Sequence, residues 1–269
     1  MDDFWLRSLR LAPQRRDEFP FSVPFARAGL AIEFTAPITF FAGENGAGKS
    51  TLLETLAVRA ALPTLGESDT DFDPSLASLR ALSDELQLKW RRRATRGFFA
   101  RAEDFFGFQK RIQATKRELE LQIKGYESQL GDNHAENTGI ERAIGYLRGQ
   151  IHELDARYGE DADARSHGEA FLNAFGQRIG APGLYLLDEP EAALSPVRQL
   201  AFLKLVKDAV EVGSQFIIAT HSPLLLRFPG AQILDFDATP PGVCEWDELS
   251  SVRLWRAFWS APNAFLRRL

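Results

Sequence analysis

The stretch that decides the fold is "GENGAGKST", Gly43 to Thr51, which matches the pattern G-x-x-x-x-G-K-[ST] in full. Glycines let successive backbone N–H groups turn toward phosphate oxygens, and a helix that follows adds its positive N-terminal dipole. Lys49 is then placed to reach the outer phosphates, and Ser50 offers a hydroxyl to Mg²⁺. The stretch therefore predicts a phosphate-binding loop, with contacts from Gly43, Glu44, Asn45, Gly46, Ala47, Gly48, Lys49, Ser50 and Thr51.

The sequence on either side of this loop has the pattern that such a loop needs. Residues 28–42, "AGLAIEFTAPITFFA", read as two short strands that break at Pro37. After the loop, apolar residues recur at helical spacing until Pro63. The order strand, loop, helix is the one that begins an α/β nucleotide-binding fold.

Two later segments place polar side chains directly after apolar strands. In "GLYLLDE", Asp188 and Glu189 emerge at the carboxyl end of a strand, where parallel sheets bind their ligands. We assign Asp188 to the metal and Glu189 to the attacking water, which a second carboxylate can orient and polarise. In "IIATHSP", His221 also follows an apolar strand, and we expect it to sense the γ-phosphate.

The composition limits the remaining function classes. The chain has 269 residues, a net charge of −5 and a pI near 5.5, so no global charge draws it to nucleic acid or anionic membranes. One cysteine, Cys244, permits no internal disulfide and suits a reducing cytosol. No stretch approaches the roughly 20 apolar residues that span a bilayer. We therefore expect a soluble, cytoplasmic protein without direct membrane insertion, and the histidine spacings predict no zinc site.

A segment with a different pattern interrupts the α/β order after residue 88. Residues 89–117 are basic, with interleaved Trp90, Phe98, Phe99, Phe105 and Phe106. The segment is either a solvated flank with core phenylalanines or a nucleic-acid contact through phosphates and base stacking. Its part "GFFARAEDFF" favours a short strand.

Helical patterns over 109–130 and 140–158, separated by turn residues, then predict an antiparallel hairpin. The hairpin forms a short arm or packs on the core. In the tail, Leu249, Val252, Trp255, Phe258 and Trp259 share one helical side. That side predicts docking on the chain's own core, with a partner surface as the alternative.

The order of these parts, with "SHGEAFL", "LLDEPEAALSP" and "ATHS", resembles the ABC-type ATPases. The likeness is to their soluble branch, with SMC and RecF-like proteins and overcoming-lysogenization-defect nucleases, and more narrowly to small bacterial predicted ATPases. It implies a P-loop NTPase fold with a mostly parallel sheet, an antiparallel β edge and a helical insertion. The nucleotide-binding core would comprise residues 1–88 and 162–245, with the insertion at 89–161 and a C-terminal amphipathic helix packed on the core at 246–269.

The resemblance also implies residue roles. Ser166, Gly168 and Glu169 would be the signature segment that closes on ATP held by a second copy of the chain. Ser166 and Glu169 equally fit a capping box for the helix that follows. Glu103, or alternatively Gln109, would link the metal site to the helical part. Phe19 or Phe21 would stack on adenine.

The function that we expect is a soluble ATPase that binds ATP and Mg²⁺ and dimerises head to tail around two ATP molecules. Hydrolysis would drive a conformational cycle on a protein partner or nucleic acid, as in DNA repair or defence. The alternatives are the ATP-binding subunit of a transporter and a nucleotide-dependent switch with slow hydrolysis. In the signature segment, His167 replaces a glycine and Glu169 a glutamine of the transporter sequence, and these departures weigh against a transporter.

Overall fold

The computed structural model describes residues 5–64, 74–130, 134–158 and 167–267. The chain divides into two compact units, residues 1–102 with 179–269 and residues 103–178. No helix in the described ranges has the length and apolarity to span a bilayer. The predicted boundaries differ from this division, because the strand at 97–101 pairs with the sheet of the first unit and the helix at 167–178 groups with the second unit.

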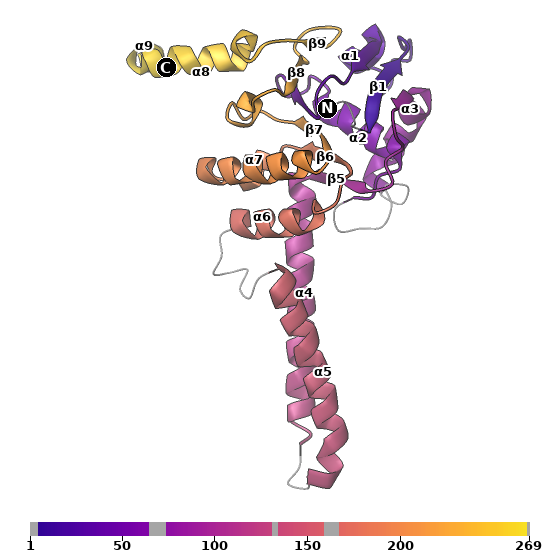
Figure 1. The fold of residues 1–269 in the computed structure, drawn as a ribbon, viewed down its shortest axis with the longest axis vertical. Helices are drawn as coiled ribbons and strands as arrows, with labels where there is room; N and C mark the ends of the chain where they lie inside the picture. Colours follow the sequence, from indigo (N-terminus) through magenta and orange to yellow (C-terminus); the bar gives the residue numbers. More distant parts are fainter. Residues whose placement is uncertain (1–4, 65–73, 131–133, 159–166, 268–269) are drawn as a thin grey trace. The chain divides into compact units, whose positions relative to one another are not determined.

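The first unit contains two sheets (Figure 1). The larger has the order β5-β6-β7-β3-β8-β9, in which all pairs are parallel except β8 with β9. Its strands are β3 (Ile38–Ala42), β5 (Gly97–Arg101), β6 (Leu184–Asp188), β7 (Gln215–Ala219), β8 (Gln232–Asp235) and β9 (Gly242–Val243). Every residue of β3, β6 and β7 is buried, which explains why these strands read as unbroken apolar runs.

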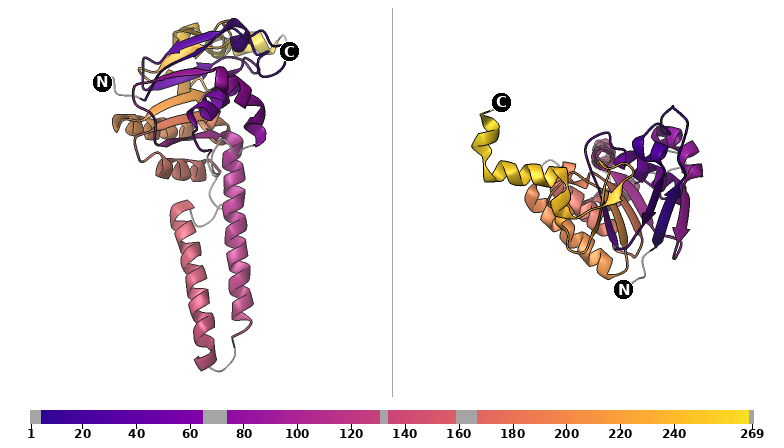
Figure 2. Two further views of the ribbon diagram at one scale, coloured as in Figure 1. Left: turned by 90° about the vertical axis from the view of Figure 1, so that its right-hand side faces the viewer. Right: turned by 90° about the horizontal axis from the view of Figure 1, so that it is seen from above.

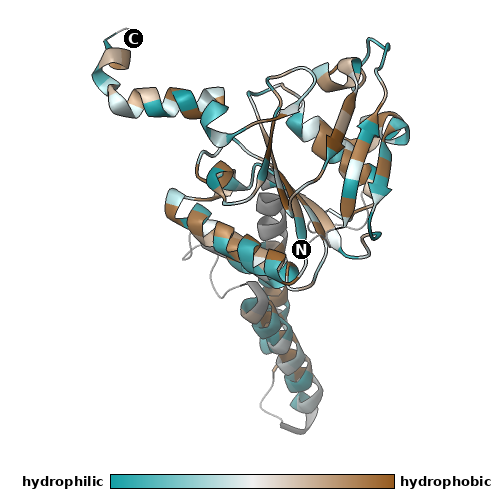
Figure 3. Ribbon diagram, turned by 45° about the horizontal axis from the view of Figure 1, so that its top comes forward, coloured by the Kyte–Doolittle hydropathy of each residue, from teal (hydrophilic) through white to brown (hydrophobic). Residues whose placement is uncertain are grey.

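The smaller sheet is antiparallel, with the order β2-β1-β4. It consists of β1 (Leu6–Leu11), β2 (Leu30–Glu33) and β4 (Gln87–Trp90). Figure 3 shows apolar and polar residues mixed along these strands, as expected for a sheet with one solvated face. The buried side chain of Gln215 joins the two sheets, because it accepts a hydrogen bond from the backbone N–H of Leu6 at 2.7 Å and donates to the Leu6 carbonyl at 3.1 Å.

One helix fills the space between the sheets. Helix α2 (Lys49–Ala60) contributes Leu52, Leu53 and Leu56 to a core cluster shared with residues of both sheets. The remaining helices of the first unit are α1 (Pro24–Ala28), α3 (Arg80–Glu85), α7 (Pro196–Glu211), α8 (Ser250–Ser260) and α9 (Pro262–Leu266), with 3₁₀ turns η2 (Pro74–Leu79), η3 (Pro190–Ala193), η4 (Leu225–Arg227) and η5 (Trp246–Glu248). The predicted α/β core with a mostly parallel sheet and an antiparallel edge is confirmed.

A glycine permits the edge strand β5 to pair closely with β6. Gly97 has φ +135°, and a Cβ there would lie 1.8 Å from the carbonyl oxygen of Leu184. Any larger residue would push the two strands apart, so the backbone approach at this point requires glycine.

The second unit contains α4 (Ala102–Glu127), α5 (His134–Tyr158) and α6 (His167–Arg178). Helices α4 and α5 form the predicted antiparallel hairpin, whose apolar seam is centred on Ile123, Ile144 and Leu147. An ion pair between Lys116 and Asp155 joins the two helices, and Arg148 pairs with Glu127 at 2.9 Å. The hairpin therefore has an apolar core of its own.

The C-terminal helices differ from the expectation that 246–269 packs on the core. Within α8 only Val252 is buried, whereas Leu254, Trp255 and Trp259 are 59%, 45% and 71% exposed. Figure 2 shows α8 and α9 extending away from the sheets of the first unit. The apolar side of this segment is stabilised mainly by its own rings, since Trp255 stacks on Trp259 and Phe258 packs on Phe265.

Candidate active site

The glycine-rich loop connects β3 to α2 and encloses the side chain of Lys49. Lys49 is the first residue of α2 and is only 4% exposed. Its Nζ donates hydrogen bonds to the carbonyl oxygens of Gly43 at 2.8 Å and Glu44 at 2.9 Å. Burial lowers the pKa of Lys49, and the nearby carboxylates of Glu189 and Asp188 oppose that effect. The ammonium group is thus held inside the loop, facing acidic side chains.

Two contacts fix the shape of the loop. Gly48 adopts φ +96° and lies so close to the Phe25 ring that a Cβ would come within 2.9 Å of it. The backbone N–H of Glu44 donates to Oδ1 of Asp237 at 2.7 Å. Sequence reasoning missed Asp237, although an acid just after the strand β8 lies at the same sheet edge as the loop.

Asp188 ends β6 directly beside the start of α2. It is 8% exposed, and its Oδ1 accepts a hydrogen bond from Ser50 Oγ at 3.1 Å. Burial raises the pKa of Asp188 to about 7; the Ser50 hydrogen bond and Arg101 lower the pKa, whereas Glu54 and Glu189 raise it. A carboxylate in this position gains stability from a cation that replaces the lost solvation.

The donor set fits Mg²⁺. A hydroxyl and a carboxylate oxygen stand next to each other at the mouth of the phosphate loop. Mg²⁺ prefers oxygen ligands and commonly takes only one or two from protein, with phosphates and water completing its shell. Within the described residues there is no cluster of three or more His, Cys, Asp or Glu side chains that could hold a metal ion.

Glu189 and His221 face each other at this same edge. Glu189 has the left-handed φ of +50°, and its backbone N–H donates to the Ala219 carbonyl of β7 at 2.9 Å. Its Oε1 lies 3.4 Å from Nε2 of His221, a separation too long for a strong hydrogen bond. The two side chains are 43% and 36% exposed, but Nε2 of His221 is itself buried and has no hydrogen-bond partner among the described residues. The left-handed backbone of Glu189 is a conformation that non-glycine residues adopt at an energetic cost and that is found often at functional sites.

A further carboxylate, Glu191, holds the loop that carries His221. Its Oε1 accepts hydrogen bonds from Thr220 Oγ1 at 2.7 Å, from the backbone N–H of His221 at 2.6 Å and from that of Ser222 at 3.1 Å. Its second oxygen, Oε2, is buried and has no hydrogen-bond partner among the described residues. Sequence reasoning assigned no role to Glu191. The signal was an acid two residues after Glu189, in a turn that returns toward the strand end.

Further side-chain hydrogen bonds join the His221 loop to the start of α7. Ser222 Oγ donates to Oε1 of Gln199 at 2.5 Å, and Nε2 of Gln199 donates to the Leu194 carbonyl at 3.2 Å. Residues 191–199 and 220–222 are therefore linked by side-chain hydrogen bonds.

Two protein-family models match parts of the chain that contain the site. Residues 23–62 match the model described as "AAA domain", and residues 170–227 match "AAA domain, putative AbiEii toxin, Type IV TA system". The cytochrome c biogenesis ATP-binding export protein CcmA of Rhodopseudomonas palustris (strain BisB18) is 28% identical over 198 residues, which cover 73% of this chain and 84% of that protein. A solved nucleotide-free ATP-binding cassette from an ABC transporter has a TM-score of 0.43 and 17% identity, with 90% of this chain and 92% of that chain covered.

The fold fits that of a P-loop NTPase. The phosphate loop between β3 and α2, the acids after β6 and the histidine after β7 all lie at the carboxyl edge of one parallel sheet. Open α/β sheets generally bind their ligands at the carboxyl ends of their strands. The sequence pattern and the sheet order thus agree on the position of the site.

Several predicted residues belong to other elements of the chain or lie outside its described residues. Ser166 lies outside the described residues, and Gly168 and Glu169 fall in the first turn of α6, in the second unit. Glu103 and Gln109 belong to α4, and the structure describes the backbone but not the side chains of residues 102–111. The roles assigned to these residues remain predictions.

The two candidates for adenine stacking differ in their exposure to solvent. Phe21 is 2% exposed, belongs to the core cluster and lies under the guanidinium of Arg16 at 4.2 Å. It is wrong as a stacking residue, because a base could not reach its ring. Phe19 is 57% exposed and remains available.

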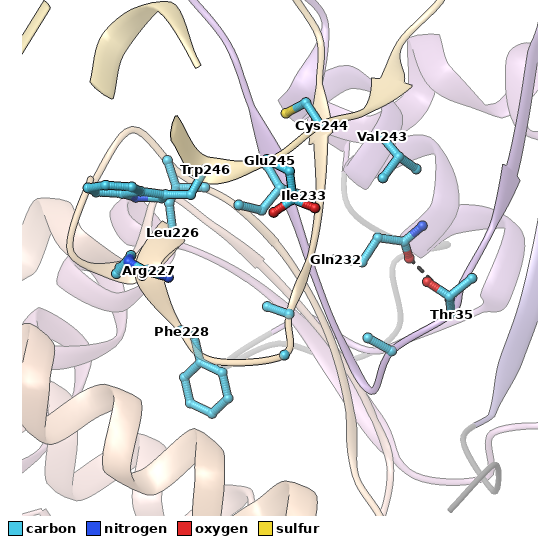
Figure 4. A pocket seen from close by; sticks show the side chains of 13 residues that line it. Thr35, Leu226, Arg227, Phe228, Gln232, Ile233, Val243, Cys244, Glu245 and Trp246 are labelled. Carbon is cyan, nitrogen blue, oxygen red and sulfur yellow. Dashed lines mark hydrogen bonds between the residues drawn. The ribbon is translucent and has the colours of Figure 1, made fainter. Parts of the chain in front are cut away.

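A hollow of about 420 Å³ lies at the opposite edge of the larger sheet (Figure 4). Gln232, at the start of β8, lines it and is fully engaged: Oε1 accepts from the backbone N–H of Thr35 at 3.1 Å and from Thr39 Oγ1 at 3.2 Å, and Nε2 donates to the Glu33 carbonyl at 2.9 Å. This hollow is separate from the phosphate loop. The amide of Gln232 already has hydrogen-bond partners, and its bonds to Glu33 of β2 and Thr39 of β3 join the two sheets.

Proposed function

We propose that the chain is an ABC-type ATPase that binds Mg-ATP at the loop Gly43–Thr51 and hydrolyses it to ADP and phosphate. The observation that supports this most directly is the convergence of Lys49, Ser50, Asp188 and Glu189 at one sheet edge. A buried lysine that faces carboxylates, with a hydroxyl beside one of them, suits a phosphate chain with its metal. Asp188 or Glu189 alone would not indicate an ATP site.

Each residue has a distinct task in the proposed reaction. The loop N–H groups and Lys49 bind the phosphates. Ser50 and Asp188 would hold Mg²⁺, which neutralises charge on the phosphates when bound. Glu189 orients the attacking water and accepts its proton, and His221 contacts the γ-phosphate. Glu191 positions His221 by fixing the backbone on which it stands.

The proposed cycle requires a second copy of the chain. Ser166, Gly168 and Glu169 of one copy would close on the ATP of the other, so that two ATP molecules lie between the copies head to tail. The start of α6 suits this role because a helix N-terminus attracts phosphate. Hydrolysis would separate the copies and drive a conformational change on a partner or nucleic acid, in the cytoplasm.

A second candidate function is the ATP-binding subunit of a transporter. The likeness to an ATP-binding export protein favours it. It requires a membrane-embedded partner that copurifies with this chain. If the tagged chain copurifies from membranes with a multi-span protein, and its ATPase rate rises on reconstitution, this candidate replaces the first.

The test of the ATPase is Glu189→Gln, with Glu211→Gln as the matched control on the exposed end of α7. We expect Glu189→Gln to bind Mg-ATP, to accumulate as a dimer in light scattering and to lose turnover by at least about a hundredfold. Glu211→Gln should behave as the wild type. Wild-type turnover in Glu189→Gln would refute the catalytic assignment, and absence of ATP binding by the wild-type chain would refute the function itself.

A further inference from the structure

The outer face of the smaller sheet carries a basic groove. A hollow of about 290 Å³ is lined by the polar residues Arg7, Ser8, Arg10, Glu33, Gln87 and Lys89. Arg7, Arg10 and Lys89 are exposed, and within the described part of the chain none of these three pairs with a carboxylate. Glu33 is the single acid among the lining residues, so the groove is positively charged.

Strand register brings these cations together from distant parts of the sequence. Ser8 lies opposite Lys89 and Arg10 opposite Gln87, which makes Arg10 and Lys89 diagonal neighbours across β1 and β4. Diagonal neighbours lie about 7 Å apart, within reach of long side chains. A β-bulge just before Ser8 leaves Arg7 without a partner on β4, and its side chain is exposed on the same groove.

The loop between β4 and β5 begins two residues after Lys89 and carries further cations. Arg91, Arg92, Arg93 and Arg96 are all exposed, and the guanidinium of Arg92 lies 4.1 Å from the centre of the Trp5 ring. The whole chain nevertheless has a net charge of −5. Positive charge gathered in one groove of an acidic protein indicates a local site for a polyanion.

The surroundings of the groove select among polyanions. Single-stranded nucleic acids are held by exposed aromatic rings on which bases stack. Here Trp5, Phe98 and Phe99 are 3%, 7% and 0% exposed, and Trp90 packs against the core. The base-stacking interpretation of the basic segment is therefore wrong for Phe98 and Phe99, because a base could not reach their rings.

A lipid surface also fits poorly. Helices and loops that bind lipid combine cations with apolar side chains that enter the membrane. Within the described residues, none of the large exposed apolar side chains lies on β1, β2 or β4. What remains is contact with phosphates alone, which is how proteins hold a duplex without reading its bases.

We propose that the groove formed by Arg7, Arg10 and Lys89, with the arginines at 91–96, binds the phosphate backbone of double-stranded nucleic acid independently of sequence. The negative charge of Glu33, on β2, would repel the phosphates and keep the nucleic-acid backbone on the β1–β4 side of the groove. The site lies on the outer face of the sheet, so binding does not depend on the ATPase proposed above. The test is therefore run without nucleotide, and its failure would leave the ATPase untouched.

The test measures fluorescence anisotropy of a labelled mixed-sequence DNA duplex with the variant Arg7→Gln/Arg10→Gln/Lys89→Gln. We expect binding at low salt to weaken by more than about tenfold, and the slope of log K against log salt to fall in magnitude by about 2.7, at roughly 0.9 per lost phosphate contact. A second duplex of unrelated sequence should bind equally well.

The matched control, Lys204→Gln/Lys207→Gln/Arg253→Gln, removes three exposed cations elsewhere on the same unit. It should bind the duplex as the wild type does, which excludes a mere effect of net charge. Circular dichroism confirms that both variants are folded. The proposal is overturned if the two variants bind equally, if a single strand of the same length binds more tightly than the duplex, or if phosphatidylglycerol vesicles are bound and the duplex is not.

Discussion

Replacing Asp188 by asparagine should change how the stability of the metal-free protein depends on pH. Burial raises the pKa of Asp188 from 3.8 to about 7. In the unfolded chain this carboxyl titrates near its ordinary value. Between about pH 4 and pH 7 the folded state therefore binds more protons than the unfolded state, and the free energy of unfolding falls as pH rises.

The size of this effect follows from the same two pKa values. Their difference corresponds to about 4 kcal/mol, at about 1.36 kcal/mol for each pH unit. Below pH 4 the group is protonated in both states and has no effect, and above pH 7 the full destabilisation is present. The amide that Asp188→Asn introduces would not titrate, although its oxygen could still accept the hydrogen bond from Ser50.

Urea unfolding in EDTA at pH 5 and pH 8 measures this difference. We expect the drop in unfolding free energy between the two pH values to be smaller in Asp188→Asn than in the wild type by up to about 2.7 kcal/mol, because only the part of the effect between pH 5 and about pH 7 falls within this interval. Asp208→Asn, at an exposed carboxylate, should match the wild type. Added Mg²⁺ should stabilise the wild type at pH 8 but not Asp188→Asn. Equal pH dependence in all three proteins would refute the reasoning.

Two further predictions concern residues that act on the site from outside it. Glu191→Ala removes the acceptor for three hydrogen bonds in the His221 loop. We therefore expect kcat to fall by about tenfold to a hundredfold, while KM for ATP stays within about twofold. A rise in KM with kcat unchanged would contradict a positioning role. Ser166→Arg should leave ATP binding at the Lys49 loop intact in equilibrium dialysis but abolish ATP-driven dimerisation and turnover. Unchanged turnover in Ser166→Arg would mean that the segment 166–169 only caps the helix that follows it.

The parts of the fold that the sequence predicted are those with strong local signals. The phosphate loop is contiguous, and its neighbours β3 and α2 have clear apolar patterns. The acids after β6 and the histidine after β7 follow buried strands, so parallel pairing alone brings them to one edge. These features needed no knowledge of distant contacts.

The features that the sequence did not predict depend on contacts between residues far apart in sequence. The basic groove exists because β1 pairs with β4, about 80 residues later, and because a bulge changes the register there. Asp237 and Glu191 act on the backbone of other loops, which no pattern in their own neighbourhood reveals. Periodicity showed that the tail is amphipathic, but it could not show that α8 leaves the core after Val252.

The position of Lys49 implies that the loop distinguishes ligands by the number of their phosphates. Two of the three N–H donors of its ammonium group already bond to the carbonyls of Gly43 and Glu44. A phosphate oxygen must compete with these carbonyls, so it gains only the difference between a bond from the ammonium to an anionic oxygen and one from the ammonium to a neutral carbonyl. Inorganic phosphate would gain little from that exchange. A triphosphate also meets the successive loop N–H groups, and its extra contacts make the exchange favourable.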